Sequence, residues 1–300
     1  MRQRLARTIV GRRFVSLKSD PFGISGLLPE TNEMFPPPSL ISFDAFGTLY
    51  VPKKPIAEQY AEIAHSYGID LPVETISSRF GKIHAELLER FPNYGKNSSE
   101  ITSSEDWWKQ LVLQVFELDA NKSHELCQAL VDHFTGPGAY TVFDDVEPAL
   151  QALKKRGVNM VVLSNSDSRV VAILKNLGLS QYFSNVYVSY ELGAEKPNKK
   201  FFDAVARKQG QTIDKYERMW HVGDHRDKDF IGAIRAGWNG VLLDRHRASG
   251  YFGPQAARQE ALISCLLASH APTHAYDKVI VANNRVVLTS LTQLVELYEF

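Results

Sequence analysis

The sequence predicts an α/β protein with a doubly wound parallel sheet, in which a helical insertion separates the first strand from the others. Three observations predict this class. Residues 40–43 form a short apolar run with the composition of a buried strand. Residues 56–134 carry apolar side chains at helical spacing. From residue 138 onward, helical and strand-like segments alternate, which is typical of crossover connections between parallel strands.

The insertion contains four apolar stripes, so we expect four consecutive helices. Gly68 predicts the end of the first helix, the turn-forming segment 91–95 ends the second, and Ser103 or Ser104 starts the third. Four helices without an intervening strand indicate a separate helical unit. The stripes contain, in order along the chain, Tyr60, Phe80, Leu111 and Leu130.

The alternating part predicts the rest of the sheet. We expect helices at 146–156, 169–177, 200–208 and 230–236, and strands at 159–163, 185–189, 219–222 and 240–243. A loop-rich stretch with an apolar helical patch at 262–267 follows, and a strand at 278–288 and a helix at 291–298 close the domain. The predicted division is a basic presequence and linker (1–38), a core domain (39–55 and 137–300) and an inserted helical domain (56–136).

Composition excludes several classes of protein. The 300 residues are 44% hydrophobic and 23% charged, which is enough apolar material for a globular core. No apolar run approaches the roughly 18 residues of a membrane span, so no membrane partner is expected. Cys127 and Cys265 cannot form a disulfide framework and fit a reducing compartment. A net charge of zero argues against nucleic acid as a partner.

The charges are unevenly distributed. Residues 1–19 contain six basic residues and no acid, which leaves 28 basic and 34 acidic residues in the remainder. An arginine-rich, acid-free head without a long apolar segment is typical of a mitochondrial presequence, so we expect a location in the mitochondrial matrix. The alternative is a basic tail without targeting value on a cytoplasmic protein.

Polar residues follow the predicted strands at the points where each strand ends. The carboxyl ends of parallel strands lie at one edge of a sheet, where ligands bind in such folds, so these residues are expected to converge. Together with the apolar residues and glycines beside them, they are Asp44, Phe46, Gly47 and Thr48 after the first strand, Ser164 and Asn165 after the second, Lys196 and Pro197 after the third, and Gly223, Asp224 and Asp229 after the fourth.

In this order and placement, the four groups resemble the four motifs of the haloacid dehalogenase (HAD) superfamily. The resemblance covers residues 39–55 and 137–245, and the insertion is placed like the C1 cap of that family. Within the insertion, segments 91–95, 107–108 and 113–116 resemble the subgroup typified by haloacid dehalogenase-like hydrolase domain-containing protein 3. The resemblance implies a HAD-like (Rossmann-like) core with a four-helix cap that closes over the active site.

The resemblance also implies roles for the phosphoryl-binding residues. Asp44 is the expected nucleophile, because a carboxylate can attack phosphorus and leave an aspartyl-phosphate that water cleaves. Lys196 supplies positive charge to the nucleophile and the phosphate. Thr48 and Ser164 are neutral donors to phosphate oxygens. Asn165 either binds the phosphate or orients its loop, and a plain turn residue is the alternative.

The expected cofactor is Mg²⁺, a hard cation that prefers oxygen ligands. By the pattern of the family, its ligands are Asp44, the backbone carbonyl of Phe46, and Asp224. Asp229 is expected to orient a metal-bound water or the loop, and the alternative is that it caps the helix beginning near Phe230.

Phe46 departs from the phosphatase pattern of the family. Typical family phosphatases carry an aspartate here that protonates the leaving group, and general acid–base help of this kind is worth roughly 10²–10⁴-fold. The preferred reading is a Mg²⁺-dependent phosphohydrolase acting on a small phosphorylated molecule, with an acid borrowed from the cap or from His225, or with substrates whose leaving groups need none. The alternative is a weak or inactive relative that binds a phosphorylated ligand or a protein partner.

A haloacid dehalogenase-like enzyme is the third reading, because dehalogenases carry a non-acidic aromatic residue at this position. It requires a halide-binding arginine in the cap, for which Arg79 and Arg90 are the candidates. A phosphonatase-like reaction would need a lysine in the cap. Lys82 is the candidate, but its sequence position favours a solvated residue on a helix. The Trp107-Trp108 pair is expected to pack within the cap, with a stacking surface for the substrate as the alternative.

Overall fold

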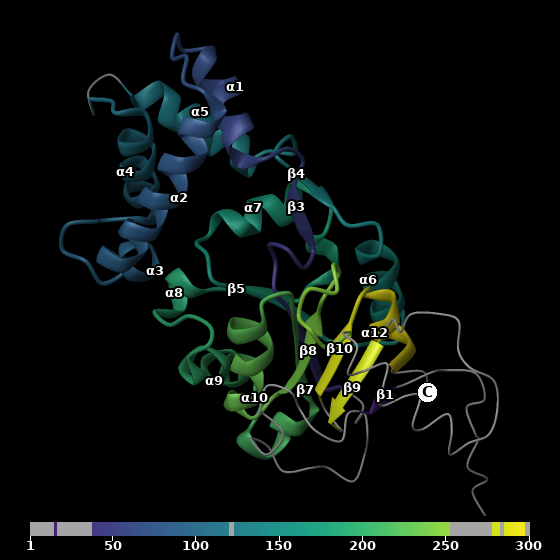
Figure 1. The fold of residues 1–300 in the computed structure, drawn as a ribbon. Coiled ribbons are helices and arrows are strands. Elements are labelled where there is room, and N and C mark those ends of the chain that lie inside the picture. Colours follow the sequence, from purple (N-terminus) through teal and green to yellow (C-terminus); the bar gives the residue numbers. More distant parts are fainter. Residues whose placement is uncertain (1–14, 17–37, 120–122, 253–277, 283–284, 298–300) are drawn as a thin grey trace, which may run out of the picture.

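The computed structural model describes residues 15–16, 38–119, 123–252, 278–282 and 285–297 (Figure 1). An eight-stranded sheet forms its centre. From β10 to β6 the neighbouring strands are parallel, whereas β9 runs antiparallel to β10. Across the sheet the strands are β1 (Val15–Ser16), β9 (Lys278–Ala282), β10 (Arg285–Leu288), β8 (Asn239–Leu243), β7 (Met219–Gly223), β2 (Leu40–Phe43), β5 (Met160–Ser164) and β6 (Asn185–Val188).

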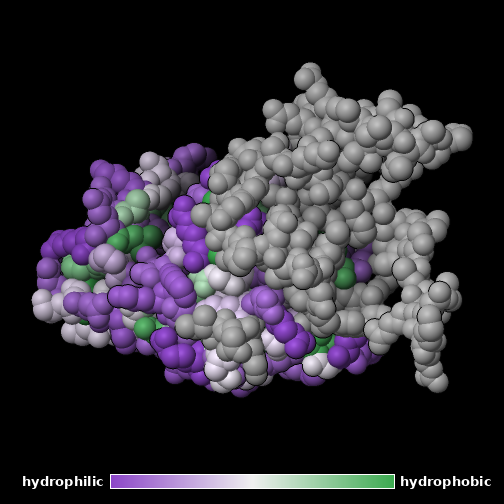
Figure 2. Space-filling view, turned by 90° about the horizontal axis from the view of Figure 1, so that it is seen from below, coloured by the Kyte–Doolittle hydropathy of each residue, from purple (hydrophilic) through white to green (hydrophobic). Residues whose placement is uncertain are grey.

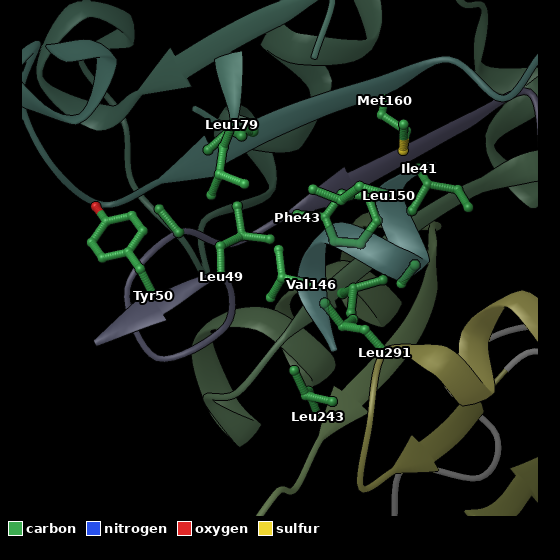
Figure 3. Close-up of a cluster of buried hydrophobic side chains, with 14 of the residues drawn as sticks. Ile41, Phe43, Leu49, Tyr50, Val146, Leu150, Met160, Leu179, Leu243 and Leu291 are labelled. Carbon is green, nitrogen blue, oxygen red and sulfur yellow. The ribbon is translucent and has the colours of Figure 1, made fainter. Parts of the chain in front are cut away.

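Strand β2 shows how the sequence builds a three-layered core. Successive strand side chains point to opposite faces, and both faces of β2 are buried. Ile41 and Phe43 pack with α6 (Val146–Lys155), α7 (Arg169–Asn176) and α12 (Thr292–Leu297) in the cluster drawn in Figure 3. Leu40 packs on the other face with α9 (Lys199–Lys208) and α10 (Gly232–Ala236). Helices on both faces explain the continuous apolar runs of the strands.

The insertion at residues 56–136 folds as a helical unit beside the sheet (Figure 1). Its described part contains α1 (Ile56–His65), α2 (Val73–Arg90), α3 (Pro92–Gly95), α4 (Ser104–Phe116) and α5 (His124–Thr135). Helix α4 begins as expected, because the side chain of Ser103 accepts a hydrogen bond from Asp106 N. The unit has a core of its own around Trp107, Leu111 and Leu130.

A second, two-stranded sheet joins the helical unit to the core. Strands β3 (Tyr50–Pro52) and β4 (Tyr140–Val142) pair antiparallel, with Tyr50 opposite Val142. Both connections of the insertion therefore run side by side, and Lys53 N also donates to Ala139 O at 2.9 Å. The sequence analysis missed these strands because three-residue strands are too short to show alternation.

Two further segments differ from the prediction. The strand predicted at 278–288 is wrong: the segment forms the antiparallel strands β9 and β10 instead. The helix predicted at 230–236 begins earlier, as the π-helical turn η3 (Arg226–Ile231). The imidazole Nδ1 of His225 accepts from the backbone N–H groups of Asp227 and Lys228, which fixes this early start.

Three short helices complete the described core: α8 (Ser189–Leu192), η1 (Ser180–Tyr182) and η2 (Ile213–Arg218). Apart from Val15–Ser16 and Pro38, the predicted presequence and linker lie outside the described residues, as do the patch at 262–267 and Cys265. Among the described helices, none combines the length and the apolarity needed to cross a membrane. On the face shown in Figure 2, the described residues are mostly hydrophilic, and hydrophobic ones appear in separate small areas.

Candidate active site

Asp44 follows the last residue of β2 and lies at the carboxyl edge of the sheet. Its backbone N–H donates to Val222 O of the neighbouring strand β7 at 2.8 Å, which fixes the start of the loop. Its carboxylate Oδ1 lies 2.6 Å from Lys196 Nζ. Burial raises the pKa of the Asp44 carboxyl to about 7, although the Lys196 ammonium acts in the opposite direction. Asp44 is thus a mostly buried carboxylate with 9% of its surface exposed.

The ammonium group of Lys196 is the cation of the site and is 2% exposed. It contacts three oxygens: Asp44 Oδ1 at 2.6 Å, Asp229 Oδ1 at 2.7 Å and the backbone oxygen of Leu163 at 2.8 Å. Burial alone would lower the pKa of Lys196, but the carboxylates of Asp229 and Asp44 raise it above its ordinary value. Lys196 is therefore protonated and fixed between two carboxylates.

Asn165 holds the loop that carries this lysine. Its side-chain Nδ2 donates to Lys196 O, and its Oδ1 accepts from Lys196 N, both at 2.8 Å. The two bonds tie the end of β5 to the lysine loop. In this structure Asn165 therefore orients the loop, which is one of the two roles considered from the sequence.

Asp229 connects the lysine to the interior of the sheet. Its Oδ1 lies 3.0 Å from His221 Nε2, and His221 Nδ1 lies 2.8 Å from Ser42 Oγ. Its Oδ2 accepts from His225 N at 3.0 Å. Although burial opposes it, Lys196 and then His221 hold the pKa of Asp229 below its ordinary range. Asp229 is an ionised carboxylate, and it accepts from the backbone N–H of His225 rather than from Phe230.

Three carboxylates converge at the edge of the sheet. One oxygen each of Asp44, Asp224 and Asp229 lie within 4.8 Å of one another. Burial, and then the charge of Asp229, raise the pKa of Asp224. An all-oxygen set of this size fits a hard divalent cation such as Mg²⁺. The sequence had placed Asp229 outside the ligand set, whereas in the structure its oxygen is as near as the others.

Gly47 permits the close approach of Asp224. Its φ of +83° lies in the region that favours glycine, and a Cβ at this position would lie 2.3 Å from Asp224 Oδ2. The neighbouring Thr48 is buried, and its Oγ1 lies 3.5 Å from Asp224 Oδ1. The loop that follows β2 therefore packs directly on the loop that follows β7.

A cavity of about 400 Å³ lies between the helical unit and this edge of the sheet. Ser164, Asn165 and the ring of Phe46 belong both to the site and to the cavity wall. Phe46 is 48% exposed and packs edge-on against Tyr50 and Tyr140. The ring that replaces the expected acid therefore forms part of the wall of this cavity.

Side-chain hydrogen bonds from segment 91–95 and from Trp108 join the helical unit to the core. Tyr94 OH donates to Asn165 O at 3.1 Å, Trp108 Nε1 to Asp167 Oδ2 at 3.0 Å, and Asn93 Nδ2 to Ser189 O at 2.8 Å. The positive φ angles of Asn93 and Tyr94, 50° and 56°, aim the segment 91–95 at the core. The sequence analysis predicts this segment as the turn that ends the second helix of the insertion.

Several candidates lie away from the cavity or serve another role. Arg79 donates to Val115 O and pairs with Glu117, and Arg90 pairs with Glu100. Lys82 is exposed and lies 3.9 Å from Glu86. His225 is exposed and uses Nδ1 to accept from the backbone.

Trp107 and Trp108 lie in different environments. Trp107 is fully buried within the helical unit, whereas Trp108 lines the cavity. The sequence analysis also missed Asp167, which is fully buried and binds the Arg169 guanidinium at 2.7 Å. The signal was present in the Ser166-Asp167-Ser168-Arg169 run directly after β5.

Comparisons with known proteins agree with this architecture. Residues 38–237 match the haloacid dehalogenase-like hydrolase family. The chain is 35% identical to an uncharacterized protein of Saccharomyces cerevisiae, over 71% of this chain and 74% of the other. It is 30% identical to haloacid dehalogenase-like hydrolase domain-containing protein 3 of Mus musculus, over 68% of this chain and 81% of the other.

Solved structures share the fold at low sequence identity. A putative HAD-hydrolase of Bacillus subtilis bound to magnesium superposes with a TM-score of 0.58 at 17% identity, covering 87% of this chain and 98% of that one. An L-2-haloacid dehalogenase gives 0.58 at 16%, covering 88% and 100%, and a HAD phosphatase from Thermococcus onnurineus gives 0.51 at 20%, covering 87% and 97%. The motif order, the parallel sheet and these matches together show that the chain belongs to the haloacid dehalogenase-like hydrolase family.

Proposed function

We propose that the chain is a Mg²⁺-dependent phosphohydrolase with Asp44 as its nucleophile. The observation that carries this proposal is the convergence of three carboxylates, from Asp44, Asp224 and Asp229, beside the buried ammonium of Lys196. A carboxylate trio is poorly suited to binding an anionic substrate unless a cation accompanies it. Bound Mg²⁺ would supply positive charge for the phosphoryl oxygens.

In the proposed reaction, Asp44 is the nucleophile, and Lys196, Thr48 and Ser164 bind the phosphoryl group. An oxygen of Asp44 forms a bond to phosphorus while the bond from phosphorus to the leaving oxygen breaks, and water then releases phosphate from the aspartyl-phosphate. The Lys196 ammonium lies 2.6 Å from the attacking carboxylate and offsets charge that develops on the phosphoryl group. Thr48 and Ser164 are buried hydroxyls at the same strand ends and would donate to its oxygens.

Phe46 limits the substrates that this site can hydrolyse. A phenyl ring cannot protonate a departing alkoxide, so substrates whose leaving groups are stable as anions should react fastest. Asp229 is occupied by Lys196 and His221, and His225 Nδ1 accepts backbone hydrogen bonds. Asp229 is therefore not free to take over this proton transfer, whereas the Nε2 of the exposed His225 is not used by these backbone bonds.

The geometry favours phosphoryl transfer over halide release. The cap arginines considered for a halide site, Arg79 and Arg90, pair with Glu117 and Glu100 and do not line the cavity. A dehalogenase also has no need for the cation that the three carboxylates would bind. The alternative of a non-catalytic binding protein is supported by Phe46, because this residue cannot act as an acid. A hydrolysis assay distinguishes that alternative from a phosphohydrolase.

The test is hydrolysis of 4-nitrophenyl phosphate by the full chain, with Mg²⁺ and with EDTA, beside the variant Asp44→Asn. We expect turnover that requires Mg²⁺ and is lost in the variant. The control Asp227→Asn removes an exposed carboxylate in the neighbouring turn and should leave turnover unchanged. Mg²⁺ and orthovanadate binding without any turnover would replace the proposal with a binding role. Halide release from 2-chloropropionate without Mg²⁺ would replace it with dehalogenase chemistry.

A further inference from the structure

The cavity between the helical unit and the core has an aromatic wall on both sides. The helical unit contributes Tyr60, Phe80 and Trp108, and the core contributes Phe46, Tyr50 and Tyr140. The rings pack edge to face, with centroids 5.1 Å apart for Tyr50 and Tyr140 and 5.4 Å apart for Tyr60 and Phe80. A preformed aromatic wall of this kind binds flat or apolar groups.

The same cavity carries no net charge. Of its lining residues, Arg169 is the one permanent cation, and both its Nε and its Nη2 donate to the fully buried Asp167. Its guanidinium also stacks 4.2 Å from the ring centroid of Trp108. The lining imidazole, His84, has its pKa lowered by burial and by Lys228, so it is neutral at pH 7. Among the described residues that line the cavity, none is an aspartate or a glutamate.

The cavity and the proposed phosphoryl site share the lining residues Phe46, Ser164 and Asn165. Ser164 lies at the end of β5 and lines the cavity, while the oxygen of Leu163, the preceding residue, accepts from Lys196. Asn165 contributes to the cavity wall and holds the backbone of Lys196. The ester substituent of a phosphoryl group bound at Asp44 would have this aromatic wall within reach. In Figure 3 Tyr50 lies at the left edge of the buried cluster, and its hydroxyl points away from Phe43 and Leu150.

From these observations we infer that the substrate is a phosphate monoester of an uncharged, ring-containing alcohol, whose organic part occupies the aromatic cavity. This inference rests on the proposed phosphohydrolase function and adds the substrate class. A volume of about 400 Å³ lies within the range of small-molecule sites. A nucleotide would bring further negative charge into a cavity whose one cationic lining residue, Arg169, is already paired with Asp167.

The test compares phosphates whose phosphoryl groups are alike and whose organic parts differ. Acetyl phosphate has no ring and reports on the phosphoryl site alone. Phenyl, 2-naphthyl and 4-carboxyphenyl phosphates all release a phenol and differ in apolar area and charge. We expect kcat/KM to rise about tenfold from phenyl to 2-naphthyl, because more apolar area is buried. We expect it to fall at least about tenfold for 4-carboxyphenyl, because a carboxylate enters an uncharged cavity.

A pair of variants ties the preference to this cavity. Val131 lines the cavity and is partly exposed, whereas Val171 is 47% exposed on α7 and does not line it. Val131→Lys should lower the ratio of kcat/KM for 2-naphthyl phosphate over acetyl phosphate about tenfold or more. The matched control Val171→Lys should leave that ratio unchanged.

The outcomes separate the inference from the function on which it rests. If acetyl phosphate and all three aryl phosphates are inert, the phosphohydrolase proposal itself fails. If acetyl phosphate is hydrolysed but 4-carboxyphenyl phosphate reacts as well as 2-naphthyl phosphate, the inference about the cavity fails and the proposed function stands. An unchanged ratio in Val131→Lys would likewise overturn the inference.

Discussion

Gly47 offers a sharp test of how the site is built. Its backbone φ is +83°, and an added Cβ would lie 2.3 Å from Oδ2 and 2.8 Å from Cγ of Asp224. Because real Cβ atoms do not approach so closely, Gly47→Ala is expected to displace the Asp224 carboxylate from its present position. Two separate costs follow: a backbone cost of about 1–2 kcal/mol for a left-handed alanine, and the loss of one metal ligand from its place.

The matched control is Gly157→Ala. Gly157 has a similar φ of +73°, but a Cβ there would meet no atom within 4 Å. Both variants should therefore lose about 1–2 kcal/mol of stability, measured by urea unfolding in EDTA. Only Gly47→Ala should also lose Mg²⁺ affinity, by about 10–100-fold, measured by calorimetric titration. Equal Mg²⁺ affinity in the two variants would refute the claim that Asp224 is a ligand held in place by Gly47.

Three further predictions follow from the same geometry. Lys196→Met leaves two buried carboxylates without their shared ammonium, so it should cost about 3–5 kcal/mol of stability; a smaller cost than for an exposed lysine variant such as Lys82→Met would contradict the buried pairing. Burial raises the pKa of Asp44 to about 7, and the protonated form does not bind a cation. Mg²⁺ affinity, titrated calorimetrically, should therefore fall about tenfold per pH unit below pH 7, and equal affinities at pH 6 and pH 8 would show otherwise. Phe46→Asp restores a proton donor and should raise hydrolysis of a poor leaving group such as glycerol 3-phosphate by about 10²-fold, with 4-nitrophenyl phosphate gaining much less; a uniform gain would exclude a role in leaving-group protonation.

The sequence predicts those parts of the fold that depend on short stretches of neighbouring residues. The apolar run before Asp44 and the alternating segments after residue 138 predicted parallel strands with polar residues at their ends, and the comparisons and the sheet confirm this class. The edge of the sheet was not predictable in the same way. The apolar segment at 278–288 forms two antiparallel strands instead of one. The second of them, β10, pairs with β8, and a contact between residues so far apart in sequence leaves no local pattern.

The same distinction holds within the site. Asp44, Lys196 and Asp224 follow strands, so the sequence could group them before any distance was known. The cavity depends on how the helical unit sits against the core. That contact is made by side chains such as Tyr94, whose left-handed backbone no local pattern predicted. Asp167 lies between the predicted strand at 159–163 and the predicted helix at 169–177, and its contact with Trp108 joins residues far apart in the sequence. Arg169, predicted at the start of that helix, stacks on the same ring.

The central claim is that Asp44 attacks phosphorus, and trapping the intermediate tests it most directly. The full chain is mixed with Mg²⁺ and excess 4-nitrophenyl phosphate, quenched in acid within the first turnovers, digested, and analysed by mass spectrometry. We predict one phosphoryl group on the Asp44 carboxylate, absent from Asp44→Asn and from the EDTA control. Mg²⁺-dependent turnover that continues undiminished in Asp44→Asn would contradict the account.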